Sequence, residues 1–179
     1  MKKFLFICAM FASTSVYAVE NDYRPYVGID YDYSTLNARG VDSYLNSGTF
    51  IVGSEYNKYF GTEIFYQKSL TKAQETTNGK MKSSFQGYGL DMFAYLPLGC
   101  EGRVAPYATA GIGKYSLKKK VSEVHHNDKD GTGYRFGAGI SYHIDNNTSL
   151  KAGYRYINFD RLSNIDHADE LVAGLRYAF

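Results

Sequence analysis

Polar and apolar residues alternate along eight segments of the chain. In each segment, one set of every second side chain is mostly aromatic or aliphatic, and the other set contains glycines and most of the charges. A period of two is typical of β-strands, because successive side chains of a strand point to opposite faces of the sheet. The predicted strands span residues 26–33, 49–56, 61–67, 88–96, 106–115, 134–144, 150–156 and 171–179.

The connections between these strands alternate between long and short. The long connections are polar and span residues 34–45, 69–83, 116–132 and 158–170, whereas the short ones span 57–59, 97–102 and 145–148. Such sorting of connections by length, with an even number of strands, is typical of transmembrane β-barrels. We therefore predict an all-β fold, an eight-stranded antiparallel up-and-down transmembrane barrel.

The first 18 residues have the composition of a secretory signal peptide. Lys2 and Lys3 precede an apolar run at 4–11, and Val16-Tyr17-Ala18 is a small-x-small cleavage signal. The run is too short to cross a bilayer as a helix. We expect cleavage after Ala18 and a barrel domain over residues 19–179. Removal of Cys8 leaves Cys100 alone, so no disulfide can form within the mature chain.

Composition agrees with this fold and excludes one class of partner. The chain has 18 Tyr, 11 Phe and 18 Gly but only 3 Pro, which suits strands with aromatic side chains at a water–lipid boundary and glycines in a narrow interior. After loss of two lysines with the signal peptide, 18 of the 20 basic residues remain against 18 acidic ones. This balance gives no indication of nucleic-acid binding.

The last predicted strand carries the most specific pattern. Its apolar row ends in Tyr177 and Phe179, and the opposite row contains the single charge Arg176. This ending resembles the terminal segment of bacterial outer-membrane barrels, which the barrel-assembly machinery of that family reads. With the signal peptide and the strand alternation, residues 19–179 resemble the small eight-stranded outer-membrane barrels, the group that contains OmpX, Ail, the opacity proteins and the transmembrane domain of OmpA.

The resemblance implies a location and a set of partners. We expect a monomer in the outer membrane of a Gram-negative cell, with extracellular long loops and both termini in the periplasm. Its partners would be membrane lipid, lipopolysaccharide and the barrel-assembly machinery, with host surface or matrix proteins at the loops. The implied role is that of an adhesin or surface antigen, or a contribution to envelope integrity.

The inward rows predict a charged lumen. An eight-stranded barrel is about wide enough for side chains to fill it, and charges buried there must be paired. We predict a salt-bridged plug, with Asp30 and Asp32 nearer the mouth. The predicted network comprises Glu55, Glu63, Asp91, Arg135, Lys151, Arg155 and Arg176. The alternative function is a narrow ion-conducting channel that uses the same residues.

The loops offer one candidate binding site. Lys114, Lys118, Lys119 and Lys120 form a cationic cluster that could bind lipopolysaccharide phosphates or an acidic host polymer, although solvation alone explains lysines in a loop about as well.

Catalytic and metal-binding patterns are weak. Ser141 and His143 lie at adjacent inward positions, but the sequence lacks the histidine that lipid A deacylases have in residues 158–162, so we expect no enzyme. His125, His126 and nearby aspartates are interpreted as a solvated loop rather than a metal site. We expect neither a metal nor a cofactor.

Overall fold

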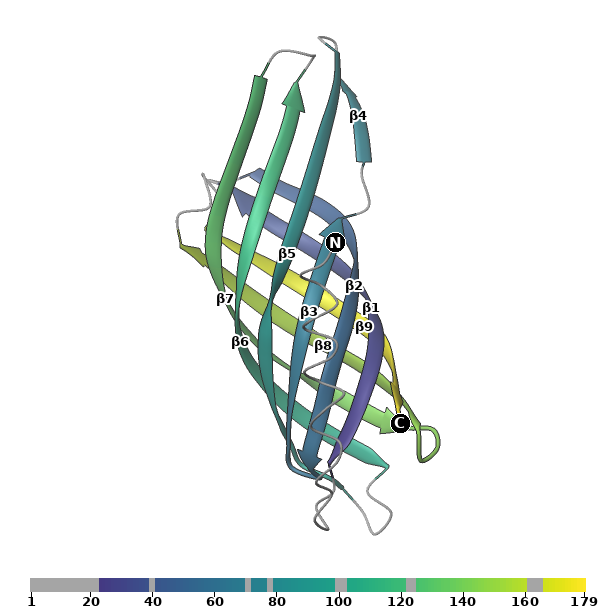
Figure 1. Cartoon of the computed structure of the whole chain (residues 1–179). Helices are drawn as coiled ribbons and strands as arrows, with labels where there is room; N and C mark the ends of the chain where they lie inside the picture. Colours follow the sequence, from purple (N-terminus) through teal and green to yellow (C-terminus); the bar gives the residue numbers. More distant parts are fainter. Residues whose placement is uncertain are drawn as a thin grey trace, which may run out of the picture.

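The regular elements of the part of the chain that the structure describes are antiparallel strands (Figure 1). The computed structural model describes residues 23–38, 41–69, 72–76, 79–98, 103–121, 125–160 and 166–179, so the predicted signal peptide lies outside the described residues. Within them, no helix is sufficiently long and apolar to cross a membrane. The nine strands are β1 Arg24–Ala38, β2 Val41–Asn57, β3 Phe60–Ser69, β4 Lys72–Thr76, β5 Gly79–Tyr95, β6 Val104–Val121, β7 His125–His143, β8 Thr148–Asp160 and β9 His167–Ala178.

Eight of these strands close into a barrel. Neighbouring strands pair in the order β3-β2-β1-β9-β8-β7-β6-β5-β4, and a further pairing of β3 with β5 joins the sheet into a ring. Strand β4 lies outside the ring, where it pairs with residues 79–83 of β5. The predicted eight-stranded antiparallel barrel is therefore confirmed, with one additional short strand.

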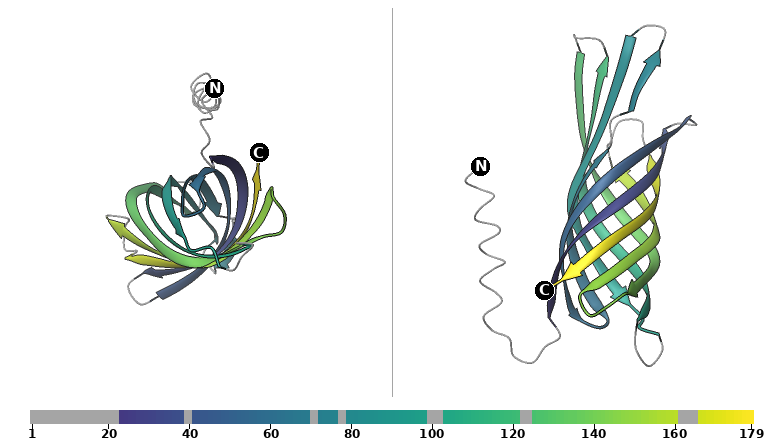
Figure 2. Two further views of the ribbon diagram at one scale, coloured as in Figure 1. Left: turned by 90° about the horizontal axis from the view of Figure 1, so that it is seen from below. Right: turned by 90° about the vertical axis from the view of Figure 1, so that its right-hand side faces the viewer.

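The two ends of the barrel differ. At one end, which we call the turn end, short connections join β2 to β3 and β7 to β8, and the C-terminal Phe179 lies there. At the other end, β3 and β5 pair only as far as Lys68 and Gln86, and β7 and β8 as far as Thr132 and Asp160. Strands β5, β6 and β7 continue beyond these pairs, and the right-hand view of Figure 2 shows them rising above the ring.

The continuing strands form an open sheet that we call the extension. It comprises β4, residues 79–84 of β5, 116–121 of β6 and 125–130 of β7. Strands occupy nearly all described residues of the segments 34–45, 69–83, 116–132 and 158–170, so the prediction of polar loops is wrong for the described part of these segments. Backbone pairing continues through these segments because it does not require the lipid-facing apolar row from which the strands were predicted.

The outer surface of the barrel is an apolar belt. Its large side chains are between about two-fifths and two-thirds exposed, which is far more contiguous apolar area than a protein surrounded by water presents. Such a belt around a closed sheet is the arrangement that a lipid environment requires. The belt includes Ile29, Tyr31, Phe50, Ile64, Tyr66, Leu90, Met92, Ile112, Phe136, Ile140, Leu150, Tyr154, Leu171 and Leu175.

The interior depends on glycines that face large side chains. Tyr115 is almost fully buried on β6, and its ring lies against the wall at Gly133 on β7. A Cβ atom at Gly133 would lie 2.6 Å from Tyr115 Cε2 and 3.1 Å from Ile157 Cγ2. The absence of a side chain at such inward positions allows one aromatic ring to cover a section of the lumen wall.

Candidate functional site

Apolar and ionic groups fill the lumen and succeed one another along the barrel axis. Toward the extension end, buried apolar side chains from six strands pack together; they are Leu36, Leu45, Phe85, Leu117, Ile157, Phe159 and Ala168. Toward the turn end, Phe93, Tyr95 and Tyr107 pack around Ala105. The register of the strands places the buried charges between these two groups. The polar plug that we predicted therefore has apolar packing on both sides.

The first ion cluster surrounds Glu63 of β3. Lys151 Nζ lies 2.8 Å from Glu63 Oε1 and Arg176 Nε 2.9 Å from the same oxygen. Arg176 also pairs with Asp30, with 2.5 Å between Nη1 and Oδ1. Each cation therefore has a carboxylate partner, which is the condition for burying charge in a barrel interior.

Aromatic groups complete this cluster. Tyr26 donates its hydroxyl hydrogen to Glu63, and Lys151 donates to the hydroxyl oxygen of Tyr95. The ammonium group of Lys151 lies 4.0 Å from the centre of the Phe93 ring. A desolvated ammonium is stabilised by the negative face of an aromatic ring, so Lys151 is held by a carboxylate and by rings together.

The second ion cluster surrounds Arg155 of β8. Its Nη1 lies 3.6 Å from Asp32 Oδ1 and 3.3 Å from Glu170 Oε2. Gln67 Nε2 also bridges the two carboxylates, at 3.4 Å from Asp32 and 2.8 Å from Glu170. Two acidic groups from β1 and β9 therefore share one guanidinium group.

The third ion cluster is a single pair. Arg135 Nη2 lies 3.4 Å from Asp91 Oδ2, and its guanidinium carbon lies 3.5 Å from the centre of the Phe65 ring. Both charged side chains are almost completely buried.

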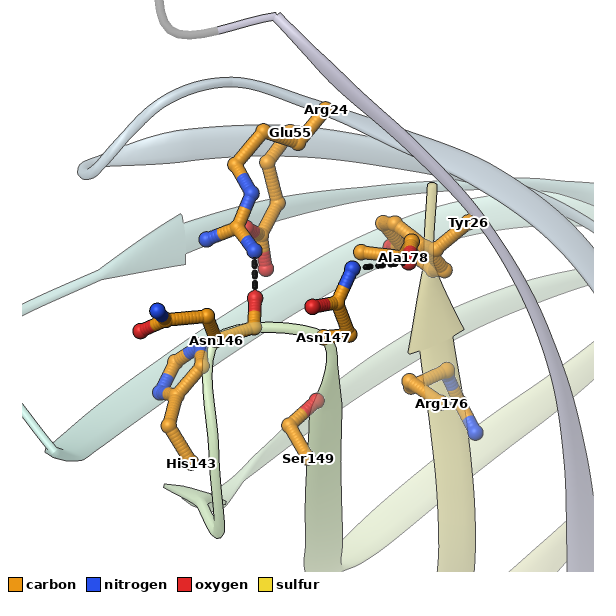
Figure 3. A pocket seen from close by; sticks show the side chains of 9 residues that line it. All are labelled: Arg24, Tyr26, Glu55, His143, Asn146, Asn147, Ser149, Arg176 and Ala178. Carbon is orange, nitrogen blue, oxygen red and sulfur yellow. Dashed lines mark hydrogen bonds between the residues drawn. The ribbon is translucent and has the colours of Figure 1, made fainter.

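The structure brings six of the seven predicted lumen residues into these clusters, whereas the seventh lies beside the first cluster, in a pocket that Tyr26 and Arg176 also line. Glu55 directly precedes a register irregularity in β2 and lines a small pocket at the turn end with Arg24 and His143 (Figure 3). Among the described residues it makes no ion pair. Sequence reasoning missed Glu170, because it was assigned to a loop. It also left Asp30 and Asp32 outside the predicted network, whereas both pair with its cations.

The predicted lysine cluster lies on the extension. Lys114 is exposed on β6, where it pairs with Thr132 at the extension end of the ring. Residues 118, 119 and 120 continue the same strand and pair with Ser84, Ser83 and Lys82 of β5 and with Asp128, Asn127 and His126 of β7. The register therefore brings Lys82 directly opposite Lys120. This backbone is strand rather than loop.

The C-terminal segment is held by its backbone and exposes its rings. Ala178 N donates to the carbonyl oxygen of Asn147. Asn147 Nδ2 donates to the carbonyl oxygen of Ala178 (Figure 3). Phe179 N donates to the carbonyl oxygen of Pro25. Tyr177 and Phe179, the predicted assembly signal, are 51% and 72% exposed with their rings 5.6 Å apart.

The turn between β7 and β8 contains one carboxylate with a perturbed pKa. Asp145 Oδ1 accepts hydrogen bonds of 2.7 Å from the backbone N–H groups of Asn147 and Thr148. These bonds stabilise the ionised form and hold the pKa of Asp145 below its ordinary value.

The weaker chemical candidates are not assembled into a site. Ser141 is buried in the lumen and its hydroxyl has no hydrogen-bond partner, and His143 Nδ1 also has none. In the described residues, no three His, Cys, Asp or Glu side chains are grouped so that they could hold a metal ion. The side chains of His125 and His126 lie outside the described set.

Comparison with known proteins identifies the family. The sequence matches the family described as outer membrane protein beta-barrel domain over residues 4–179. A comparison with curated protein sequences gives no significant match.

Three solved structures are similar to this fold. Neisserial surface protein A is 18% identical, with a TM-score of 0.74 over 87% of this chain and 97% of that protein. Ail of Yersinia pestis is 17% identical, with a TM-score of 0.65 over 88% and 99%. The N-terminal barrel domain of OprF from Pseudomonas aeruginosa is 17% identical, with a TM-score of 0.54 over 86% and 97%. This chain thus belongs to the outer membrane protein β-barrel family, as a closed eight-stranded barrel of the Gram-negative outer membrane.

Proposed function

We propose that this protein is a surface recognition protein of the outer membrane, whose extension contacts ligands outside the cell. The observation that carries the proposal is the continuation of β5, β6 and β7 beyond the closed ring. A strand that only crosses the bilayer needs about 9 to 11 residues, whereas β6 and β7 have 18 and 19. The surplus length projects an ordered sheet away from the membrane.

The orientation that we propose follows from the two ends of the barrel. Short turns on the periplasmic side and long segments outside are the rule for this class of barrel. The turn end and Phe179 would then face the periplasm, and the extension would face the exterior. Membrane lipid and lipopolysaccharide would surround the belt, and the barrel-assembly machinery would read the segment that ends in Tyr177 and Phe179.

The ligand that we propose is an anionic polymer. Lysines occur at positions 80, 82, 118, 119 and 120 of the extension, and the strand register brings Lys82 opposite Lys120. Such a concentration of positive charge favours sulfated or phosphorylated partners. Ail, which shares this fold, was crystallised with the heparin analogue sucrose octasulfate. Adhesion to acidic host polymers, or contact with lipopolysaccharide phosphates, is the corresponding role.

The open edges of the extension offer a second kind of contact. Beyond the ring, β4 pairs only with β5, and residues 125–131 of β7 pair only with β6. Exposed strand edges present backbone N–H and C=O groups that can pair with another extended chain. A proteinaceous ligand could therefore add to the sheet while the lysines attract its acidic groups.

A binding experiment tests the proposal. Cells that display the native protein are compared with cells that display the Lys118→Gln/Lys119→Gln/Lys120→Gln variant for retention on immobilised heparin and on heparin-free resin. We expect strong, salt-sensitive retention of the native protein and most of that retention lost in the variant. The matched control is Lys58→Gln at the turn end, which lowers charge on the other side of the membrane. Equal retention of all three proteins would contradict the proposal.

The alternative function, a narrow channel, requires an open path through the lumen. Apolar packing lies on both sides of the ion clusters, and each cation in them contacts a carboxylate. We therefore expect no steady conductance when the purified barrel is inserted into a planar bilayer. Long-lived open events in the native protein would favour the channel.

A further inference from the structure

The charges buried in the described part of the lumen do not balance. Five carboxylates are buried there, those of Asp30, Asp32, Glu63, Asp91 and Glu170. Four cations accompany them, namely Arg135, Lys151, Arg155 and Arg176. One negative charge is therefore in excess inside a sealed interior, where an uncompensated charge is strongly unfavourable.

The ion pairs locate the excess. Glu63 and Asp30 are matched by Lys151 and Arg176, two against two. Asp91 is matched by Arg135, one against one. Asp32 and Glu170 share Arg155, two against one. The unbalanced charge therefore belongs to the Asp32–Glu170 pair.

Around this pair, hydrogen-bond acceptors outnumber the donors that reach them. Ser34 donates to Glu170, Thr49 donates to Asp32, and Gln67 Nε2 donates to both carboxylates. Asp32 Oδ1 nevertheless accepts no hydrogen bond, and neither does Gln67 Oε1; the hydroxyl oxygen of Ser47 also has no partner. Ser47 is the residue directly opposite Asp32 on β2, and all three side chains are fully buried.

The surroundings supply no further positive charge. Arg155 is the one cation in ion-pair contact with Asp32 or Glu170 among the described residues, and it also faces Asp30 and Asp91. From β1, Asp30 adds negative charge two residues from Asp32. Strands β2 and β3 contribute the neutral Ser47, Thr49 and Gln67, and Gly137 lies opposite Arg155 on β7.

We propose that the Asp32–Glu170 pair is a buried site for one monovalent cation, either a proton shared by the carboxylates or a sodium ion. A proton on Asp32 Oδ1 would turn an unpaired acceptor into a donor for a neighbouring oxygen, as when two close carboxylic groups hold a single proton between them. A sodium ion would take the same unpaired oxygens as ligands. Either occupant makes the buried charges of the described lumen neutral. The site lies next to the apolar residues Leu36 and Ala168, on the side of the turn end.

The test combines infrared spectroscopy with unfolding. In sodium-free buffer at neutral pH, a bound proton gives the carbonyl stretch of a protonated carboxyl group that persists in D2O. This band is expected in the native barrel and lost in Asp32→Asn and in Glu170→Gln. It is retained in Asp91→Asn, the matched control, which removes a carboxylate from a balanced pair.

The second arm distinguishes sodium from a proton. The urea midpoint of the native barrel is measured at neutral pH against sodium concentration, with potassium replacing sodium at constant ionic strength. A rise with sodium that is absent in Asp32→Asn, with no infrared band, identifies sodium. A band with no sodium dependence identifies the proton. The proposal is overturned if neither signal occurs, or if either signal persists unchanged in Asp32→Asn and Glu170→Gln. Asp32→Asn should itself remain folded, because it removes the excess charge.

Discussion

Strands β5, β6 and β7 pass through two regions that are held together differently. Within the ring, each strand pairs on both sides and its inward side chains pack against the opposite wall. In the extension, the same strands form an open sheet whose outer members, β4 and β7, each pair on one side. The comparison indicates that stability depends on closure and on the lumen, whereas the extension adds strand pairs beyond the ring.

The largest expected effect comes from breaking the Glu63 cluster. Glu63→Gln leaves Lys151 without a carboxylate and removes one of the two partners of Arg176. Removing one partner of a buried ion pair costs about 3–5 kcal/mol, so the urea midpoint should fall strongly. The chain has no Trp, so unfolding is followed by circular dichroism.

A double variant separates charge from packing at this cluster. Glu63→Gln/Lys151→Met removes the unpaired ammonium and places a thioether near Phe93, while Arg176 keeps Asp30. It should recover much of the lost stability. If the double variant were less stable than Glu63→Gln alone, the cost could not be attributed to an uncompensated charge.

A moderate effect is expected where a glycine faces an aromatic ring. Gly133→Ala would force the Tyr115 ring away from the β7 wall and should cost about 1–3 kcal/mol, as overpacking of a filled interior does. The matched control is Gly48→Ala on β2, where an added Cβ meets no atom within 4 Å. Equal urea midpoints for the two variants would mean that Tyr115 does not fill the lumen as described.

A smaller effect is expected at the β7–β8 turn, and it depends on pH. Because the pKa of Asp145 is lower in the folded barrel than in the unfolded chain, its contribution is complete above the unfolded pKa and is lost as pH falls through the folded value. Asp145→Ala should therefore lower the urea midpoint slightly at neutral pH and have no effect in acid. A difference between native and variant that grows toward acid pH would contradict this.

The smallest effect on stability is expected from the extension. Residues 119–127 can be replaced by Asn-Gly, a favourable two-residue hairpin turn, between the paired positions Lys118 and Asp128. This change leaves every pair of the ring intact, so we expect the urea midpoint to shift by less than about 0.5 kcal/mol, while retention on heparin is lost. A large loss of stability would show that the extension supports the ring.

The alternation of apolar and polar residues predicted the barrel well. The outward side chains of each strand must suit lipid, and the inward side chains must fit the filled lumen, so both rows of a strand are constrained. The strand that alternation predicted ends at residue 115, whereas β6 continues through residues 116–121, which are mostly polar yet remain paired with β5. For the same reason Glu170 was assigned to a loop, although it lies on β9 opposite Arg155. Glu55 shows a different error. It continues the inward row of β2, but there it lines the pocket at the turn end and makes no ion pair among the described residues. Alternation gives the face on which a residue lies but not its partners along the barrel axis.

The paired strands of the extension also restrict how this protein can change in length over evolution. Each residue added to both β6 and β7 would move the tip outward by about 3.4 Å. One residue per strand would exchange the two faces of everything beyond the insertion, whereas two residues per strand would preserve the faces. Homologues that retain the same binding face should therefore differ in the length of this hairpin by even numbers of residues per strand.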